Sequence, residues 1–102
     1  MLRFELFLAC LLHETEQDKI RWRRGFRRNC YIAILNNGAL RIERYWNVLR
    51  LVFLDSSGMP RWEFFCHCQD PDSPVGDLFD LIEATEKARR QVVKKMLQEL
   101  NG

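Results

Sequence analysis

The residues with the clearest chemical potential form one basic segment, 19–28. It holds six Lys or Arg residues and no acidic residue, and since the whole chain has a formal charge of +2, the remainder carries −4. Trp22 and Phe26 are interleaved with these cations. Cations bind phosphates and aromatic rings stack on bases, so this pattern predicts a nucleic-acid-binding segment. The residues expected to bind are Lys19, Arg21, Trp22, Arg23, Arg24, Arg27 and Arg28.

Two other interpretations of this segment stay open. The even spacing of Ile20, Trp22 and Phe26 also fits a strand or loop whose apolar residues face the core while its cations are solvated. The arginines could equally pair with an acidic protein partner. The leading hypothesis is a small non-enzymatic protein that binds RNA or structured DNA. The alternative is a protein-binding adaptor or inhibitor, such as an accessory protein of a virus, phage or mobile element.

Large aromatic residues suggest a second kind of surface. Tyr45 is followed by Trp46, and Arg61 by Trp62, and Trp, Tyr and Arg are the types enriched at interaction hot spots. A small core cannot hold every large apolar side chain, and those left at the surface usually mediate association. We therefore predict an interface that includes Tyr45, Trp46 and Trp62. The alternative is that all three tryptophans lie in the core.

Metal binding and catalysis have weaker support. The segment Cys66-His67-Cys68 and the pair Cys10 and His13 offer thiols and imidazoles, but strong zinc motifs place two residues between paired cysteines, and here only one intervenes. No nucleophile signature or glycine-rich phosphate loop is present. We therefore predict no metal, no cofactor and no catalytic residue. A small toxin-like ribonuclease, acting by general acid–base chemistry with arginines stabilising charge, is the third functional hypothesis.

A long C-terminal helix is the clearest structural prediction. Ser73 is a typical helix cap, Pro74 is a typical first helical residue, and apolar residues recur at helical spacing from Leu78 to Leu100. Acidic residues fill the first half of this stretch and basic residues the second, an order that complements the helix dipole. The helix is expected to end near Asn101.

The middle of the chain is rich in strand-forming residues. Asn36-Asn37-Gly38 is a strong hairpin signal. The apolar run that starts at Val48 is interpreted as a further strand or as the preceding strand continued past a bulge near Trp46 and Asn47. The pattern predicts an antiparallel meander of three to four strands. The strand candidates are residues 30–35, 39–45, 48–54 and 61–68.

The N-terminal residues 2–12 fit either a helix or a strand. Apolar residues alternate there, which suits a strand, but residues 1–14 contain no Val, Ile or Thr and are rich in helix-forming Leu. We predict a helix, with an extra strand as the alternative. The expected fold is α+β: an N-terminal helix, possibly a strand, then the antiparallel meander, then the long C-terminal helix packed on the sheet.

Composition sets the expected environment and assembly. With 102 residues, 47% of them hydrophobic and 29% charged, the chain is expected to form one domain, 1–102. Four cysteines without a recognisable secretory leader or a membrane-length apolar run predict free thiols, a cytoplasmic location and no membrane partner. Two helices can cover only one sheet face, and the run 48–54 contains a single charge, Arg50. We therefore predict a homodimer that buries the second face.

Overall fold

The chain forms a five-stranded antiparallel sheet flanked by two helices, in the residues that the structure describes. These are residues 2–70 and 72–101, with side chains from residue 5 onward, in a computed structural model. The strands follow one another as a meander, in the order β1-β2-β3-β4-β5. The predicted α+β architecture is confirmed. The elements are α1 (Leu2–Glu16), β1 (Trp22–Arg24), β2 (Cys30–Leu35), β3 (Gly38–Tyr45), β4 (Val48–Asp55), β5 (Pro60–His67) and α2 (Pro74–Asn101).

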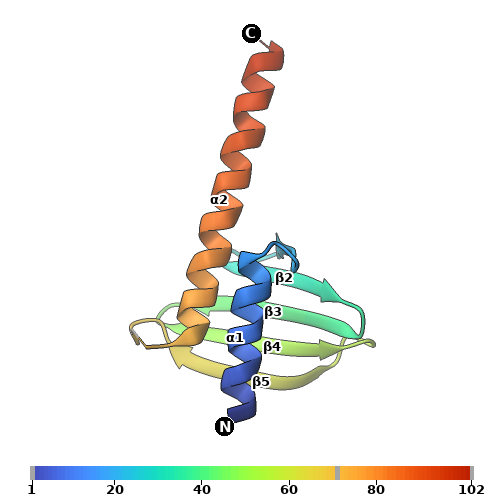
Figure 1. Ribbon diagram of the computed structural model, residues 1–102, viewed down its shortest axis with the longest axis vertical. Coiled ribbons are helices and arrows are strands. Elements are labelled where there is room, and N and C mark those ends of the chain that lie inside the picture. The colour runs from blue at the N-terminus through green and yellow to red at the C-terminus, as the bar shows by residue number, and fades with distance from the viewer. Residues whose placement is uncertain (1, 71, 102) are drawn as a thin grey trace.

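Both helices lie on the same face of the sheet (Figure 1). The N-terminal segment is a helix, as predicted, and not an extra strand. The apolar side of α1 contributes Leu8 and Leu11 to the core, and the start of α2 contributes Leu78 and Phe79, all at most 5% exposed. The Phe79 ring packs edge-on against Tyr31 of β2, with 5.7 Å between ring centroids. The core therefore fills the layer between the helices and one sheet face.

The sheet has five strands, whereas the sequence predicted three or four. β1 lies inside the basic segment and is three residues long, and only Trp22 among these three is apolar, so no apolar run marks it as a strand. The run from Val48 is a separate strand, β4, so the alternative of a bulge near Trp46 and Asn47 is wrong: these two residues form a hairpin turn, and Tyr45 pairs with Val48 across it. Trp46 has a φ of 55°, a conformation that is rare for a bulky residue. The residue type at position 46 therefore did not predict a turn there.

The hairpin predicted at Asn36-Asn37-Gly38 is confirmed, since Leu35 of β2 pairs with Gly38 of β3. A Cβ atom at Gly38 would lie 2.1 Å from the carbonyl oxygen of Leu54. No side chain fits so close to the neighbouring strand, so the turn depends on glycine at this point.

Strand alternation assigns side chains to two different faces. On the helix-covered face, Leu40, Ile42 and Leu51 are fully buried. On the opposite face, hereafter the open face, Arg41 and Glu43 of β3 lie beside Arg50 of β4. The open face is therefore mixed. The neighbouring strands place charges beside Arg50, but the exposed Ile34 and Phe65 also lie on this face. The homodimer that would bury it stays a prediction.

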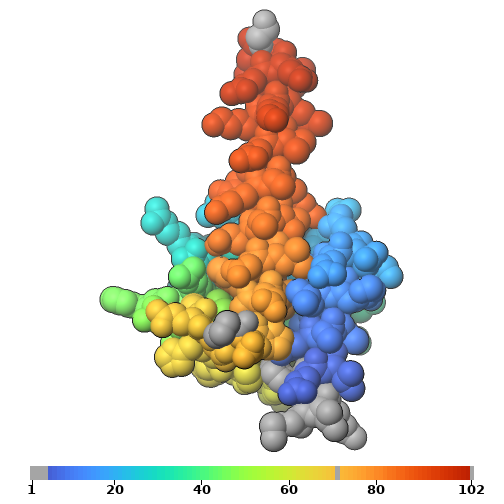
Figure 2. Space-filling view, turned by 60° about the vertical axis from the view of Figure 1, so that its left-hand side comes forward, coloured from blue at the N-terminus to red at the C-terminus, as the bar shows by residue number. Residues whose placement is uncertain are grey.

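The long helix α2 begins on the sheet and ends far from it (Figures 1 and 2). Its predicted cap is confirmed, because Ser73 Oγ accepts a hydrogen bond from the Gly76 amide at 3.3 Å. The buried residues of α2 are Val75, Leu78, Phe79 and Ile82, all within its first third. None of the described helices is long and apolar enough to cross a membrane.

The turn between β4 and β5 is organised by one carboxylate, Asp55, which predicts a specific acid sensitivity. Asp55 Oδ1 accepts hydrogen bonds from the Ser57 hydroxyl at 2.7 Å and from the Met59 amide at 3.0 Å, and Oδ2 pairs with Arg61 at 2.7 Å. These bonds hold the pKa of Asp55 well below its ordinary value, and the bond from Ser57 has the largest effect. A lowered pKa stabilises the fold above the unfolded-state pKa of about 3.9, and this stabilisation is lost as the pH falls further.

We expect Asp55→Asn to lower the melting temperature at neutral pH, and the difference from the wild type to shrink between about pH 4 and pH 2. Thermal unfolding followed by circular dichroism at several pH values measures this difference. Asp80→Asn, at an exposed site on α2, is the control. A difference that stays constant down to pH 2 would contradict a stabilising role for the Asp55 charge.

Candidate functional site

The basic segment does not form one continuous basic surface, because strand β1 divides its side chains between both faces of the sheet. Trp22 points into the core, is 5% exposed, and donates its indole N–H to Thr15 Oγ1 at 3.1 Å. Arg24 pairs in register with Tyr31 on the same, helix-covered side, while Arg23 pairs with Ile32 on the open face. The ring of Trp22 belongs to the core, so it is left out of the candidate surface.

The remaining cations of the segment lie at its two ends. Lys19 is exposed, and its Nζ lies 4.0 Å from Oε2 of Glu14, a residue near the end of α1. Arg21 is exposed just before β1, and Arg27 and Arg28 are exposed in the loop that joins β1 to β2. The structure therefore brings Arg23 and Arg27 to the open face. Arg24 lies on the helix-covered side, and Lys19, Arg21 and Arg28 lie outside the strands.

The loop 25–29 is held in place by backbone hydrogen bonds at both ends. The Gly25 amide donates to the Cys30 carbonyl at 2.8 Å, and the Asn29 carbonyl accepts from the Arg44 amide at 2.9 Å. Asn29 has a φ of 56°, in the left-handed region that Asn tolerates better than most residues. A loop fixed in this way carries Phe26, whose side chain is fully exposed.

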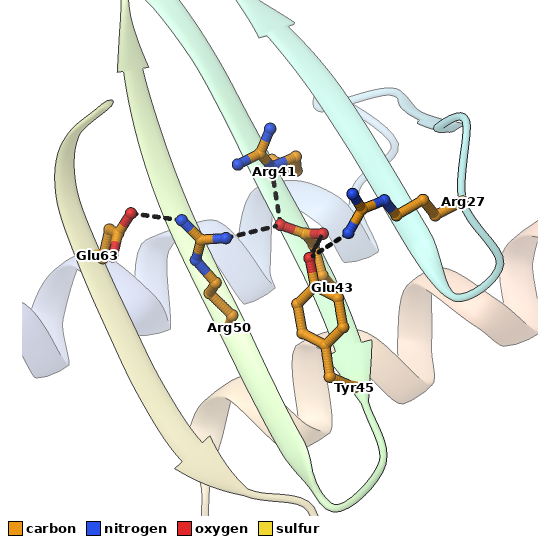
Figure 3. A network of polar contacts seen from close by, with 6 residues as sticks. All are labelled: Arg27, Arg41, Glu43, Tyr45, Arg50 and Glu63. Carbon is orange, nitrogen blue, oxygen red and sulfur yellow. Dashed lines mark hydrogen bonds and ion pairs between the residues drawn. The ribbon is translucent and has the colours of Figure 1, made fainter. Parts of the chain in front are cut away.

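At the centre of the open face, a buried glutamate binds several cations and a tyrosine (Figure 3). Glu43 is 4% exposed, and its Oε1 lies 2.9 Å from Arg41 Nε and 3.5 Å from Arg50 Nη1. Its Oε2 accepts a hydrogen bond from the Tyr45 hydroxyl, and this hydroxyl in turn accepts one from Arg27 Nη1 at 3.3 Å. The basic loop is thereby tied to the middle of the sheet.

Arg50 extends the network to the far strand. Its Nη2 donates a hydrogen bond to Glu63 of β5, and this bond is the main reason why the pKa of Arg50 is raised. The guanidinium also lies 5.8 Å from the ring centroid of the exposed Phe65, within the range of a cation–π contact. Arg50 therefore stays charged and is fixed in orientation by three neighbours.

A hollow of about 230 Å³ lies beside Glu43, between the basic loop and the sheet. It is smaller than the pockets of about 300–1,000 Å³ that hold drug-sized ligands, so it fits one small group such as a phosphate or part of a base. Cys30 is among its walls, and burial, with the nearby Glu43 charge, raises the pKa of this thiol. The lining residues are Phe26, Arg27, Cys30, Ile32, Arg41, Glu43, Tyr45 and Arg50.

Two exposed aromatic side chains lie at the same end of the sheet as this hollow. Phe26 belongs to the β1–β2 loop and Trp46, 93% exposed, to the β3–β4 turn, and in a meander these two connections are at one end. The predicted interface residues do not form one patch. Tyr45 lies on the open face, whereas Trp62 lies on the helix-covered face, where Phe7 packs edge-on against it at 6.0 Å.

The sequence prediction missed Arg41, Glu43 and Arg50 at the centre of the site, although it named Tyr45 as an interface residue. Arg41 and Glu43 occupy alternate positions of β3, interleaved with the apolar Leu40 and Ile42. This period of two indicates a polar strand face, but Glu43 also pairs with Arg50 of β4, and no local pattern reveals that contact.

The comparisons with known proteins add no candidate site. No protein-family model matches the chain, and neither the curated proteins nor the solved structures contain a significant match. Among the described residues, no three His, Cys, Asp or Glu side chains are grouped so that they could hold a metal ion. Cys66 instead contacts the Ser73 hydroxyl at 3.1 Å, and burial raises its pKa.

We expect Glu43→Gln to destabilise the protein by about 1.5–3 kcal/mol, the range for hydrogen bonds to charged groups. The Nε atoms of Arg41 and Arg50 are buried and make no hydrogen bond within the described residues. The Glu43 charge faces both guanidinium groups, whereas Glu63 pairs with Arg50 alone. Glu63→Gln is the matched control: its side chain is 35% exposed and it shares Arg50, so a loss below about 1 kcal/mol is expected. Urea unfolding at neutral pH measures both changes, and equal losses would contradict the central role of Glu43.

Proposed function

We propose that this protein binds single-stranded nucleic acid, without cleaving it, on the open face of its sheet. The observation that carries the proposal is the position of the fully exposed Phe26 at the rim of an arginine-lined hollow. Because the Phe26 ring is exposed and not packed in the core, it is available for stacking on a base. Arg27 beside it is exposed and can bind a phosphate, and Arg41 and Arg50, which are paired with glutamates, line the same hollow.

The charges of the open face favour an anionic ligand. Arg23, Arg27, Arg41 and Arg50 contribute four positive charges to this face, and Glu43 and Glu63 contribute two negative ones. The two glutamates also hold Arg41 and Arg50 in fixed positions, which reduces the entropy lost when a phosphate binds. Guanidinium groups suit this role because they bind phosphate through two parallel hydrogen bonds.

The aromatic residues favour unpaired bases over a duplex. Bases in a duplex are already stacked, whereas single strands offer free faces to exposed rings. Phe26 and Trp46 at one end of the sheet, with Phe65 on the open face, would provide such stacking platforms. Sequence-independent binding, dominated by phosphates and stacking, is the mode that these residue types support.

A ribonuclease is less well supported, although Glu43, Tyr45 and the exposed His67 share the open face. A general base must lie within hydrogen-bond reach of the proton that it abstracts. The Glu43 carboxylate is nearly buried and already binds two arginines and the Tyr45 hydroxyl, so a substrate hydroxyl has little access to it. Binding without cleavage requires no rearrangement of this network.

A protein partner is the second candidate function, favoured by the exposure of Trp46. An exposed tryptophan next to arginines is typical of interaction hot spots, and an adaptor or inhibitor of a virus, phage or mobile element would use it in this way. In either case we propose a cytoplasmic setting, because all four cysteines are free thiols and two of them have raised pKa values.

We expect the protein to bind a fluorescent single-stranded RNA or DNA oligonucleotide with an affinity that falls steeply as salt rises. Phe26→Ala and Trp46→Ala should each weaken binding by about 1–3 kcal/mol, the value of one stacked base. Arg23→Ala combined with Arg27→Ala should also flatten the salt dependence, by about 0.7 in the log–log slope for each phosphate that these arginines neutralise. Fluorescence anisotropy over a salt series measures all three effects.

Two controls make this experiment specific to the open face. Met59→Ala removes an exposed apolar side chain at the opposite end of the sheet, and Lys94→Ala with Lys95→Ala removes two exposed cations on α2. Both should leave the affinity nearly unchanged. No binding at low salt would exclude the proposal, cleavage of the RNA but not the DNA would favour the ribonuclease, and a protein retained on Trp46 after nuclease treatment would favour the adaptor.

A further inference from the structure

The C-terminal half of α2 is an exposed amphipathic helix. Every residue from 87 to 101 is exposed, whereas the buried residues of α2 all precede position 83. Figure 2 shows this half, in orange and red, projecting beyond the rest of the molecule. Five large apolar side chains, hereafter the stripe, are each more than half exposed on it: Val92, Val93, Met96, Leu97 and Leu100.

The stripe continues the same side of α2 that packs on the sheet. Val93, Met96 and Leu100 follow the buried Ile82 by 11, 14 and 18 residues, and at about 3.6 residues per turn these separations return to nearly the same direction. The ion pair between Arg89 and Asp18, at 2.9 Å, marks the end of the packed part. The apolar side of α2 therefore continues beyond Arg89, where no other described helix or strand covers it.

We propose that the stripe pairs with the same stripe of a second copy of this chain, the two α2 helices running antiparallel. Arg89, Val93, Met96 and Leu100 are spaced four, three and four residues apart, as in the seam of a coiled coil. In the antiparallel register, Val93 packs against the partner's Met96, and Leu100 against the aliphatic part of the partner's Arg89. This inference does not depend on the proposed nucleic-acid binding.

The charges of α2 fit a second copy in this orientation. Lys87 and Lys94 lie on the side of the helix opposite the stripe, so pairing does not bring them together. The last turn of α2 contains no basic residue to balance the negative end of the helix dipole. Antiparallel pairing places the C-terminal end of α2 beside Arg89 and Arg90 of the partner subunit. Parallel pairing would instead place the two Arg89 side chains of the dimer against each other.

An anionic membrane is the alternative occupant of the same helix. Helices that lie on membranes carry Lys and Arg on their polar side, and Lys87 and Lys94 are placed in this way. Arg89 favours a second copy instead, because it lies in line with Val93, Met96 and Leu100 on the apolar side. In the antiparallel pair this cation meets the negative end of the partner's helix, whereas a membrane would place it against the acyl chains.

The seam is short, so the dimer should depend on protein concentration. From Arg89 to Leu100 it extends about 17 Å, at about 1.5 Å per residue. Stable dimers usually bury about 1,200–2,000 Å² in total, and a seam of three turns lies at or below the lower end of this range. We expect dissociation on dilution into the low micromolar range.

Sedimentation equilibrium from about 5 to about 500 µM tests the pairing. The wild-type mass should rise from 12.2 kDa towards twice that value. Val93→Glu with Met96→Glu should stay monomeric, while Gln91→Glu with Gln98→Glu, which adds the same charge behind the stripe, should dimerise like the wild type. Circular dichroism checks that both variants remain folded. A monomeric wild type, or a dimer that survives Val93→Glu with Met96→Glu, overturns the proposal, and so does stripe-dependent flotation with vesicles containing phosphatidylserine if the protein stays monomeric.

A charge exchange tests the orientation. Val93→Lys with Met96→Glu in one chain pairs Lys with Glu only if the helices are antiparallel, so this chain should associate more strongly than the all-Glu double variant. A mixture of the all-Glu double variant with Val93→Lys plus Met96→Lys gives Lys–Glu pairs in either orientation. If the mixture dimerises and the Val93→Lys, Met96→Glu chain does not, the antiparallel arrangement is wrong.

Discussion

The alternation of side chains along a strand is the constraint on which the rest of this structure depends. Each strand sends successive side chains to opposite faces, and both helices lie on the same face of the five-stranded sheet. The centre of the covered face is apolar, as Leu40, Ile42 and Leu51 show. The other face has no helix to exclude water, so its residues must be stable in contact with solvent and still hold the strands together.

The network around Glu43 meets this requirement with charge rather than with apolar packing. Three strands contribute to it: Arg41 and Glu43 from β3, Arg50 from β4 and Glu63 from β5. Ion pairs between exposed side chains contribute little, but Glu43 is nearly buried, so water screens its ion pairs less. The same arrangement fixes guanidinium groups on an open surface, so the interactions that stabilise the sheet also create the candidate binding site.

Much of the fold follows from local sequence, and the exceptions share a physical cause. Ser73 and Pro74 mark the start of α2, and Asn36-Asn37-Gly38 marks a hairpin, because capping and turn formation depend on a few neighbouring residues. The turn at Trp46 escaped prediction since a tryptophan at positive φ is imposed by the pairing of β3 with β4 and not by its own preference. The Glu43 site likewise exists only once three strands are in register.

The exposed part of α2 could not be recognised from its pattern either, because its apolar spacing is the same as in the packed part. Periodicity shows that one side of a helix is apolar, and only the tertiary structure shows where the cover ends, here near Arg89. That boundary also separates two surfaces. The open face lies on the side of the sheet away from both helices, and the stripe lies beyond the sheet altogether. Since neither surface covers the other, pairing through the stripe leaves each copy's open face free, and a dimer would present two such faces to one ligand, with the gain in avidity set by the ligand's ability to reach both.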